Sequence, residues 1–270
     1  MTSDGAAQDP VVVTRDDQAA VAIVRMNRPD RRNALTTELK VALRDALEDV
    51  GQDDDVRAVV LAAAGSAFCV GQDLGEHAET LRSGNPDAMR TVPEHYNRIT
   101  SALATMPKPA IAAIGGTCVG AGLGFALACD LRLAAAGVRF ATAFAGIGFG
   151  GDSGLSATLA HAVGASRATD LLMLGDTFTA EQARDWGVVR EVVAAEDLDD
   201  KALALARRLA TGPTRAYAEI KAAIALGTVS ALPTVLEHEG AAQSRLAATE
   251  DHRNAVESFL AKEKPTFHGR

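Results

Sequence analysis

The chain has 270 residues, of which 47% are hydrophobic, 23% charged and only 4% aromatic. That length accommodates one large domain or two small ones, with a core built from small aliphatic side chains. The net charge of −8 argues against a nucleic-acid-binding surface, and no apolar run approaches the ~20 residues of a membrane span.

The first 194 residues are predicted to alternate strands with helices after a disordered start at residues 1–10. Residues 65–76 read as a loop, and Gly51 is a plausible helix stop. The expected elements are a hairpin (11–26), a helix (36–51), a buried strand (56–63), a helix (87–105), a buried strand (110–114), a glycine-rich loop with a helix (119–128) and short strands (130–136, 139–143 and 188–193).

Helices dominate the rest of the chain. They are expected at 153–162, 166–174, 180–186, 196–210, 214–226, 231–247 and 250–262. The pattern predicts an α/β core over residues 11–194 and a helical region over 195–270.

The three cysteines, Cys69, Cys118 and Cys129, lie in apolar stretches. An odd number of cysteines, with a polar and acidic N-terminus that is no signal peptide, favours reduced thiols and a cytoplasmic protein. The histidines show no metal-ligand spacing, so no metal site is expected.

The loop GIGFGGDSGLS, residues 146–156, fits three different patterns. Its GDSG resembles a protease nucleophile loop, but an Ala-rich, helical chain with Leu155-Ser156 following does not suit such a protease, and Ser153 is out of register for a nucleophile elbow. Its GxGxxG lies past mid-chain, where a dinucleotide fingerprint is not expected. What remains is a lone acid, Asp152.

Two further glycine-rich loops each follow a buried strand, at 65–74 and 115–124. Small residues allow backbone N–H groups to come close to a ligand. One N–H from each loop could converge on one oxygen, as in an oxyanion hole. Tight packing of the loops is the alternative interpretation.

Four motifs in this order resemble the crotonase, or enoyl-CoA hydratase/isomerase, family. They are NRPDRRNAL (27–35), GSAFCVGQDL (65–74), PKPAIAAIGGTCVGAGLGFALACDLRLA (107–134) and FAGIGFGGDSG (144–154), with weaker similarity in WGVVREVV (186–193) and FLAKEKPTF (259–267). The resemblance spans roughly residues 11–267. It implies a crotonase-like spiral of ββα turns with a helical C-terminal trimerisation region, assembled as a homotrimer or a dimer of trimers.

The resemblance also implies an acyl-CoA substrate and no cofactor besides the CoA that the substrate carries. The thioester oxygen is expected between the backbone N–H groups of Gln72 and Ala121, where the family usually has Ala or Ser and then Gly. The remaining residues expected to contact the substrate or its CoA are Arg28, Arg32, Ala34, Asp73, Leu74, Phe144, Phe259 and Lys262, the last two often across a subunit boundary.

The sequence departs from family hydratases at both glutamates that activate water, because Gly124 and Phe144 occupy those positions. Asp152 falls where some family isomerases place a catalytic aspartate. One carboxylate is sufficient to move a proton during a double-bond shift. Burial against Phe144, Phe149 and Leu155 would raise the pKa of Asp152 and strengthen it as a base.

The preferred hypothesis is therefore an isomerase of the family with Asp152 as acid/base. Capping of the following helix is the structural alternative for Asp152. A hydratase with a reduced set of acids, a relative that uses Asp as a nucleophile on an aryl-CoA, and a non-catalytic acyl-CoA-binding protein stay open.

Overall fold

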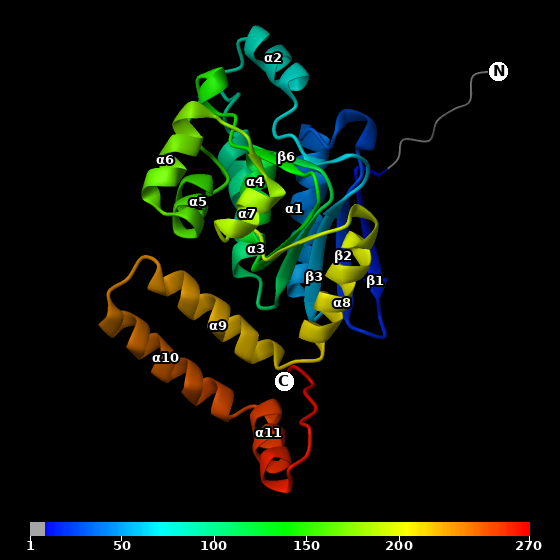
Figure 1. The fold of residues 1–270 in the computed structure, drawn as a ribbon, viewed down its shortest axis with the longest axis vertical. Coiled ribbons are helices and arrows are strands. Elements are labelled where there is room, and N and C mark those ends of the chain that lie inside the picture. The colour runs from blue at the N-terminus through cyan, green and yellow to red at the C-terminus, as the bar shows by residue number, and fades with distance from the viewer. Residues whose placement is uncertain (1–8) are drawn as a thin grey trace, which may run out of the picture.

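The computed structural model describes residues 9–270 (Figure 1). The disorder predicted for residues 1–10 falls mainly on residues 1–8, which lie outside the described residues. The carbonyl groups of Asp9 and Pro10 accept hydrogen bonds from the side-chain amide and the backbone N–H of Asn27. In the described part of the chain no helix is both long and apolar enough to cross a membrane.

A six-stranded sheet forms the centre of the molecule. Its strands lie in the order β1 (Val11–Asp16), β2 (Val21–Met26), β3 (Ala58–Ala63), β5 (Ala110–Ile114), β7 (Leu131–Ala135) and β10 (Glu191–Val193). The β1–β2 hairpin is antiparallel, and all other neighbours are parallel. All five residues of β5 are buried, as expected for a parallel strand covered on both faces.

A second, four-stranded sheet lies beside the first. Its order is β4 (Ala67–Cys69), β6 (Thr117–Val119), β8 (Arg139–Ala141) and β9 (Phe178–Thr179), with only the β8–β9 pair antiparallel. The consecutive pairs β3–β4, β5–β6 and β7–β8 each give one strand to each sheet. This arrangement confirms the predicted spiral of ββα turns.

The helices of the core cover both sheets. They are α1 (Thr37–Gln52), α2 (Leu74–Arg82), a π-helical turn (Val92–Tyr96) continuous with α3 (Asn97–Thr105), α4 (Ala121–Ala128), α5 (Leu155–Val163), α6 (Ala165–Leu174), α7 (Ala180–Asp185) and α8 (Leu198–Ala210), with 3₁₀ turns at Pro29–Arg31, Ala145–Ile147 and Ala195–Asp197. The α1 helix begins where the Thr36 hydroxyl accepts a bond from the Leu39 N–H, and it buries the apolar stripe seen in the sequence.

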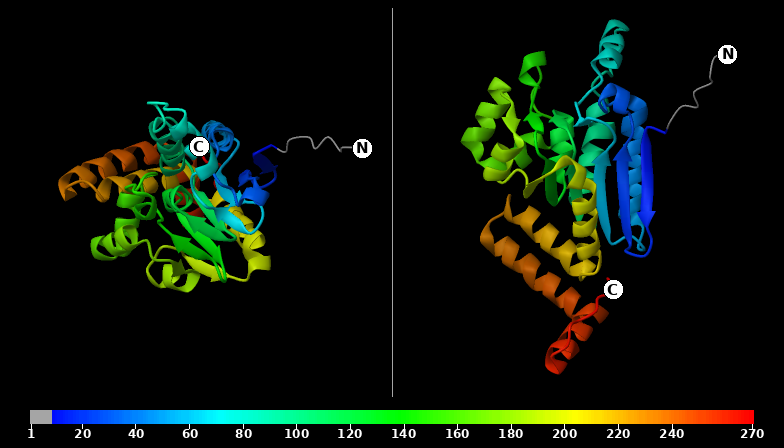
Figure 2. Two further views of the ribbon diagram at one scale, coloured as in Figure 1. Left: turned by 90° about the horizontal axis from the view of Figure 1, so that it is seen from above. Right: turned by 45° about the vertical axis from the view of Figure 1, so that its right-hand side comes forward.

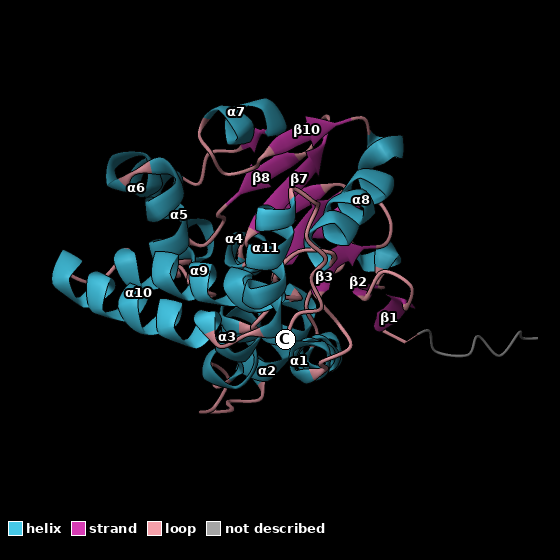
Figure 3. Cartoon of the chain, turned by 90° about the horizontal axis from the view of Figure 1, so that it is seen from below, coloured by secondary structure: helices cyan, strands magenta, loops and turns pink. Residues whose placement is uncertain are grey.

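The last three helices extend away from the sheets, as Figures 2 and 3 show. They are α9 (Thr214–Gly227), α10 (Leu232–Ala247) and α11 (Glu250–Ala261). Lys221 on α9 ties them to the core, because its ammonium lies 2.9 Å from the Asp130 carboxylate and 2.7 Å from the Leu103 carbonyl oxygen. The α8 helix instead lies against the large sheet, and the domain division at residue 194 stays a prediction.

The last residues of the C-terminal tail are anchored by hydrogen bonds to Arg57 and Asp251. The Arg57 guanidinium donates to the Phe267 carbonyl at 3.0 Å, to the Gly212 carbonyl at 2.5 Å and to the Thr214 hydroxyl at 2.9 Å. The buried Asp251 carboxylate accepts from the N–H groups of His268 and Gly269. These bonds return the end of the chain to the edge of the core.

Several predicted boundaries are wrong for local reasons. Gly51 does not stop α1, which runs to Gln52. The loop at 65–76 contains β4, whose three residues are too short for a period to show, and the start of α2, which was not predicted. Regular helix between 87 and 105 is confined to residues 97–105, because Pro93 lies in the π-helical turn before it.

Candidate active site

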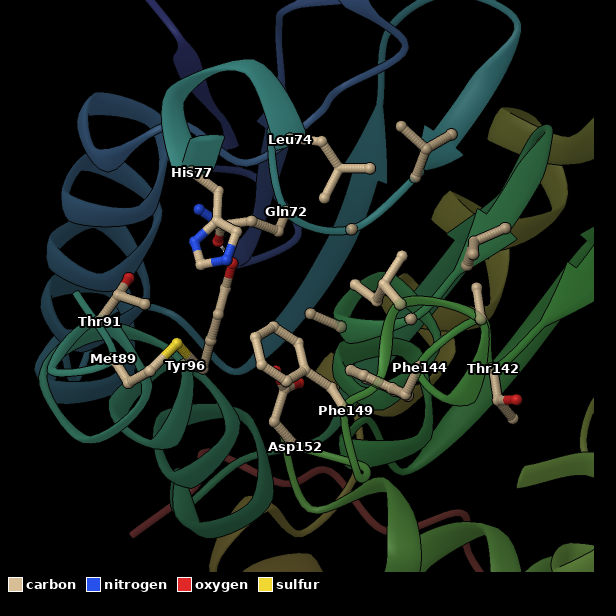
Figure 4. A pocket seen from close by; sticks show the side chains of 17 residues that line it. Gln72, Leu74, His77, Met89, Thr91, Tyr96, Thr142, Phe144, Phe149 and Asp152 are labelled. Carbon is tan, nitrogen blue, oxygen red and sulfur yellow. Dashed lines mark hydrogen bonds between the residues drawn. The ribbon is translucent and has the colours of Figure 1, made fainter. Parts of the chain in front are cut away.

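A cavity of about 200 Å³ opens at the ends of β4, β6 and β8 of the small sheet, beside the 144–154 loop. Most of its wall is apolar or backbone, and Figure 4 shows the side chains that point into it. The lining residues that matter below are Gln72, Leu74, His77, Thr91, Tyr96, Ala121, Phe144, Phe149 and Asp152. The cavity thus brings together five residues of the predicted site from four separate segments, namely Gln72, Leu74, Ala121, Phe144 and Asp152.

The Gln72 N–H is presented by a short backbone bridge to the segment before α1. Leu35 donates its N–H to the Gly71 carbonyl at 2.8 Å and accepts from the Asp73 N–H at 3.2 Å. This parallel bridge uses the groups on either side of Gln72 and turns the Gln72 N–H the other way. Among residues 9–270 that N–H has no backbone acceptor.

The second predicted donor, Ala121, is the first residue of α4. Gly120 before it has φ +57° and ψ −125°, a conformation that favours glycine. The first N–H groups of a helix have no partner inside the helix and carry its positive dipole end. A Cβ placed on Gly71 would lie 3.8 Å from the Ala121 nitrogen, so the two loops are in van der Waals contact where both donors emerge.

Asp152 follows the 3₁₀ turn at Ala145–Ile147 and is half-buried in the cavity wall. Its Oδ1 accepts a hydrogen bond from the Ser153 hydroxyl at 2.8 Å. Burial raises the pKa of Asp152, and the Ser153 bond and the charge of Lys40 partly offset that rise. The direction is the one expected from its apolar neighbours.

The capping alternative for Asp152 is contradicted by the start of α5. The N-cap residue is Gly154, at φ +70°, and the helix has no side-chain cap. Only the backbone carbonyl of Asp152 contributes, by accepting from the Leu155 N–H at 2.9 Å. The carboxylate therefore remains available to the cavity. Ser153, whose sequence context does not fit a nucleophile, is 1% exposed and donates its hydroxyl hydrogen bond to Asp152.

Gly124 is glycine because the 144–154 loop packs directly on it. A Cβ at this position would lie 2.6 Å from the Ser153 Cβ and 2.8 Å from the Ser153 carbonyl oxygen. A glutamate there would collide with the segment that carries Asp152. The other glutamate position holds Phe144, which is 7% exposed and lines the cavity with its ring.

A cluster of hydrogen-bonded polar side chains closes the side of the cavity nearest α1. The Tyr96 hydroxyl donates to the Gln72 Oε1, and Lys40 Nζ lies 3.4 Å from the same oxygen and 2.7 Å from the Thr91 hydroxyl. Lys40 Nζ also lies 5.3 Å from the centre of the Tyr96 ring. Burial raises the pKa of Tyr96 above its usual range and lowers that of Lys40.

The NRPDRRNAL segment lies next to the cavity rather than in it. Arg28 donates to the Ala34 carbonyl at 2.7 Å and pairs with Asp73 at 3.1 Å. Asp73 also caps α2 through the N–H groups of Gly75 and Glu76. Arg32 is exposed, with φ +51°. A CoA role for these residues stays a prediction.

Phe259 and Lys262 lie at the far end of the molecule, where α11 is opposite α2 along the longest axis (Figure 1). Phe259 is 81% exposed. One chain alone does not bring them to the cavity, so their predicted contact with CoA depends on a neighbouring subunit.

Sequence reasoning missed the polar side of the cavity: Lys40, His77, Thr91 and Tyr96. The positions of Lys40 and Thr91 carry no motif. Lys40 interrupts the buried face of α1, and this is the one signal that pointed to it, because a lysine is almost never fully buried without a partner.

Comparison with known proteins gives a consistent result. A family model described as enoyl-CoA hydratase/isomerase matches residues 16–270. A 1,2-epoxyphenylacetyl-CoA isomerase from Escherichia coli K12 is 38% identical over 253 residues, covering 94% of this chain and 97% of the relative. A protein named probable enoyl-CoA hydratase from Rhodobacter capsulatus is 34% identical, covering 93% and 95%.

Solved structures agree with these relatives. A crystal structure described as that of an enoyl-CoA hydratase/isomerase from Mycobacterium abscessus superposes with a TM-score of 0.92 at 50% identity. The match covers 96% of this chain and 100% of that chain.

Proposed function

The chain belongs to the enoyl-CoA hydratase/isomerase family, whose members act on CoA thioesters, and on that premise we propose that it shifts a double bond in an acyl-CoA with Asp152 as the acid/base. The observation that carries the proposal is the composition of the cavity. Asp152 is the only carboxylate among the described residues that line it.

The proposed reaction needs one proton transfer out and one back. The Asp152 carboxylate removes a proton beside the thioester carbonyl, and the resulting enolate oxygen accepts hydrogen bonds from the Gln72 and Ala121 N–H groups. The electron pair moves along the chain, and Asp152 returns the proton to a carbon further on. No water is consumed, and the raised pKa of Asp152 makes it a stronger base than a free aspartate.

The hydratase alternative requires a second group to hold and activate water. Neither family position can supply it, because a Cβ on Gly124 would lie 2.6 Å from the Ser153 Cβ and because the Phe144 side chain is apolar. The E. coli relative is named an isomerase, which supports isomerisation here. Two rivals remain: a relative that uses Asp152 as a nucleophile on an aryl-CoA, and a non-catalytic acyl-CoA-binding protein, which needs the same cavity and the same two N–H groups.

The test is mass spectrometry of 2-enoyl, 3-enoyl and aryl-CoA thioesters incubated with the protein in D₂O. We expect deuterium uptake and a shifted double bond, with no water added to the thioester. In Asp152→Asn the rate should fall by about 10²–10⁴ with thioester binding nearly intact. Asp170→Asn, on the exposed surface of α6, is the matched control.

Two results would contradict the proposal. Addition of the elements of water by the wild-type protein would make it a hydratase. Unchanged thioesters that nevertheless bind in calorimetry would favour the non-catalytic binder.

The proposal extends to the assembly and the cell compartment. The exposed apolar side chains of α9–α11 support a homotrimer or dimer of trimers in which Phe259 and Lys262 reach a neighbour's CoA. The free, buried cysteines support a cytoplasmic location. No cofactor is proposed beyond the CoA of the substrate.

A further inference from the structure

Lys40 is a buried cation without an acidic partner. Lys40 is 1% exposed, and its ammonium group makes no salt bridge within residues 9–270. Its ammonium has three donors, of which the Thr91 hydroxyl and the Gln72 Oε1 accept two. Burying a lysine in this way is costly unless something compensates its charge.

The Lys40 side chain also borders a polar cavity. Lys40 lines a second cavity, of about 360 Å³, whose wall also includes Thr37, Asn85, Arg90 and His95. This polar cavity shares Gln72, His77 and Thr91 with the cavity that Asp152 lines, which is called the acyl cavity below. Figure 4 shows Gln72, His77, Thr91 and Tyr96 together on one side of the acyl cavity. The two cavities are therefore adjacent at these shared residues.

The other charged side chains of the polar cavity do not favour an anionic ligand at Lys40. Both Glu76 oxygens accept from the Thr37 N–H at the start of α1. Arg90 pairs with Glu94 at 2.5 Å. The wall carries three acids, Glu76, Asp87 and Glu94, against one lysine and one arginine, Lys40 and Arg90. A second carboxylate entering this space would meet net repulsion, whereas a neutral oxygen would not.

The Thr91 hydroxyl orients the ammonium. It accepts from Lys40 Nζ at 2.7 Å and shares a hydrogen bond with the His95 Nδ1 at 3.1 Å. The chain of bonds from His95 through Thr91 fixes where Lys40 Nζ lies, next to the boundary between the two cavities.

We infer that the polar cavity is a subsite for a neutral oxygen substituent on the acyl group, a hydroxyl, ether or ketone oxygen that accepts a hydrogen bond from Lys40. The inference rests on the proposed binding of an acyl-CoA in the neighbouring cavity. It names the substrate class as an acyl-CoA oxygenated away from the thioester.

The test compares three saturated acyl-CoA series that cannot react, at four, six and eight carbons. One ends in a methyl group, one in a hydroxyl and one in a carboxylate. Calorimetry with the wild-type protein should give a Kd at least about tenfold lower for the hydroxyl than for the methyl thioester at one or more lengths, as expected for a charge-assisted bond. The carboxylate should gain less than the hydroxyl.

Lys40→Met should abolish the hydroxyl preference and leave the methyl series unchanged. Lys108→Met is the matched control, because Lys108 is also buried (4% exposed) but donates to the Val50 and Asp53 carbonyls, far from the cavity. That variant should keep the preference even if its melting temperature falls. If Lys40→Met is unfolded, Lys40→Gln and the wild-type series still decide the outcome.

The inference fails if the methyl thioesters bind more tightly at every length, or if the preference for oxygen survives in Lys40→Met. A carboxylate that binds more tightly than the hydroxyl overturns the choice of a neutral oxygen. If methyl thioesters bind and no oxygen preference exists, the proposed function stands and only this subsite is lost. If no thioester binds, the proposed function itself is wrong.

Discussion

At the scale of single residues, the proposed role of Asp152 as acid/base predicts a pH dependence of activity. Burial raises the pKa of this carboxyl above its usual 3.8, and the positive charge of Lys40 lowers it. The base must be ionised, so kcat/KM should rise with pH through a pKa above 3.8. In Lys40→Met the rise should move to higher pH. A pH–rate profile checks both statements, and an acid limb at or below 3.8 in the wild-type protein contradicts the first.

The same shift predicts an effect on stability. A carboxyl whose folded pKa is raised binds its proton more tightly in the folded state. Its contribution to stability is therefore present at low pH and is lost as pH rises through the folded pKa. The Asp152→Asn variant has no carboxyl group to ionise at this position. At pH values above the folded pKa of Asp152, its melting temperature should therefore exceed that of the wild type. At lower pH the two melting temperatures should approach each other. Thermal unfolding at several pH values measures the difference, and a lower melting temperature at neutral pH would contradict the argument.

At the scale of elements, the packing of α4 against the 144–154 loop excludes the hydratase glutamate. Gly124→Ala places a Cβ 2.6 Å from the Ser153 Cβ. We expect a loss of about 1–3 kcal/mol in the free energy of unfolding from overpacking, together with lower activity as Asp152 is displaced. Gly124→Glu should lose more and gain no water addition. Gly150→Ala, which has open space around it, is the control for stability in denaturant titrations. Hydratase activity in Gly124→Glu would contradict the steric argument.

What the sequence predicted at this scale follows from how far apart the interacting residues lie. The strands of the large sheet, β8 of the small sheet and most helices were predicted because apolar periodicity is local. The strands β4, β6 and β9 were not predicted, because two or three residues are too few to show a period. The loops of Gln72 and Ala121 and the position of Asp152 came from the family motifs. The polar side of the cavity could not be predicted, since it depends on Lys40, Gln72 and Tyr96 meeting from three segments across 56 residues. The N-cap of α5 was uncertain until backbone angles placed it at Gly154.

At the scale of the whole molecule, α11 lies far from the cavity of its own chain, so the predicted contact of α11 with CoA requires an assembly that can be tested. Apolar side chains on α9 and α10 face solvent in the single chain: Ile220, Ile224, Leu232 and Leu236, each more than half exposed. Paired changes Ile224→Asp and Leu236→Asp should shift the protein to a monomer in light scattering behind size exclusion. Val13→Asp, at 41% exposure on the edge strand β1, should not.

Assembly and CoA binding are coupled if Lys262 acts on a neighbour's substrate. Lys262 ends α11 in a left-handed conformation, φ +58°, far from the cavity of its own chain. In the assembled protein Lys262→Met should weaken binding of CoA thioesters, because it removes the ammonium group that is proposed to bind a CoA phosphate. In the monomeric double variant, which already lacks the neighbour, the same change should add nothing. This double-mutant cycle separates the two origins of a CoA effect, because an equal loss in both backgrounds would mean that Lys262 acts within its own chain. Because α11 lies far from the cavity of its own chain, we expect the coupled loss, and no loss in either background would mean that Lys262 does not contact CoA.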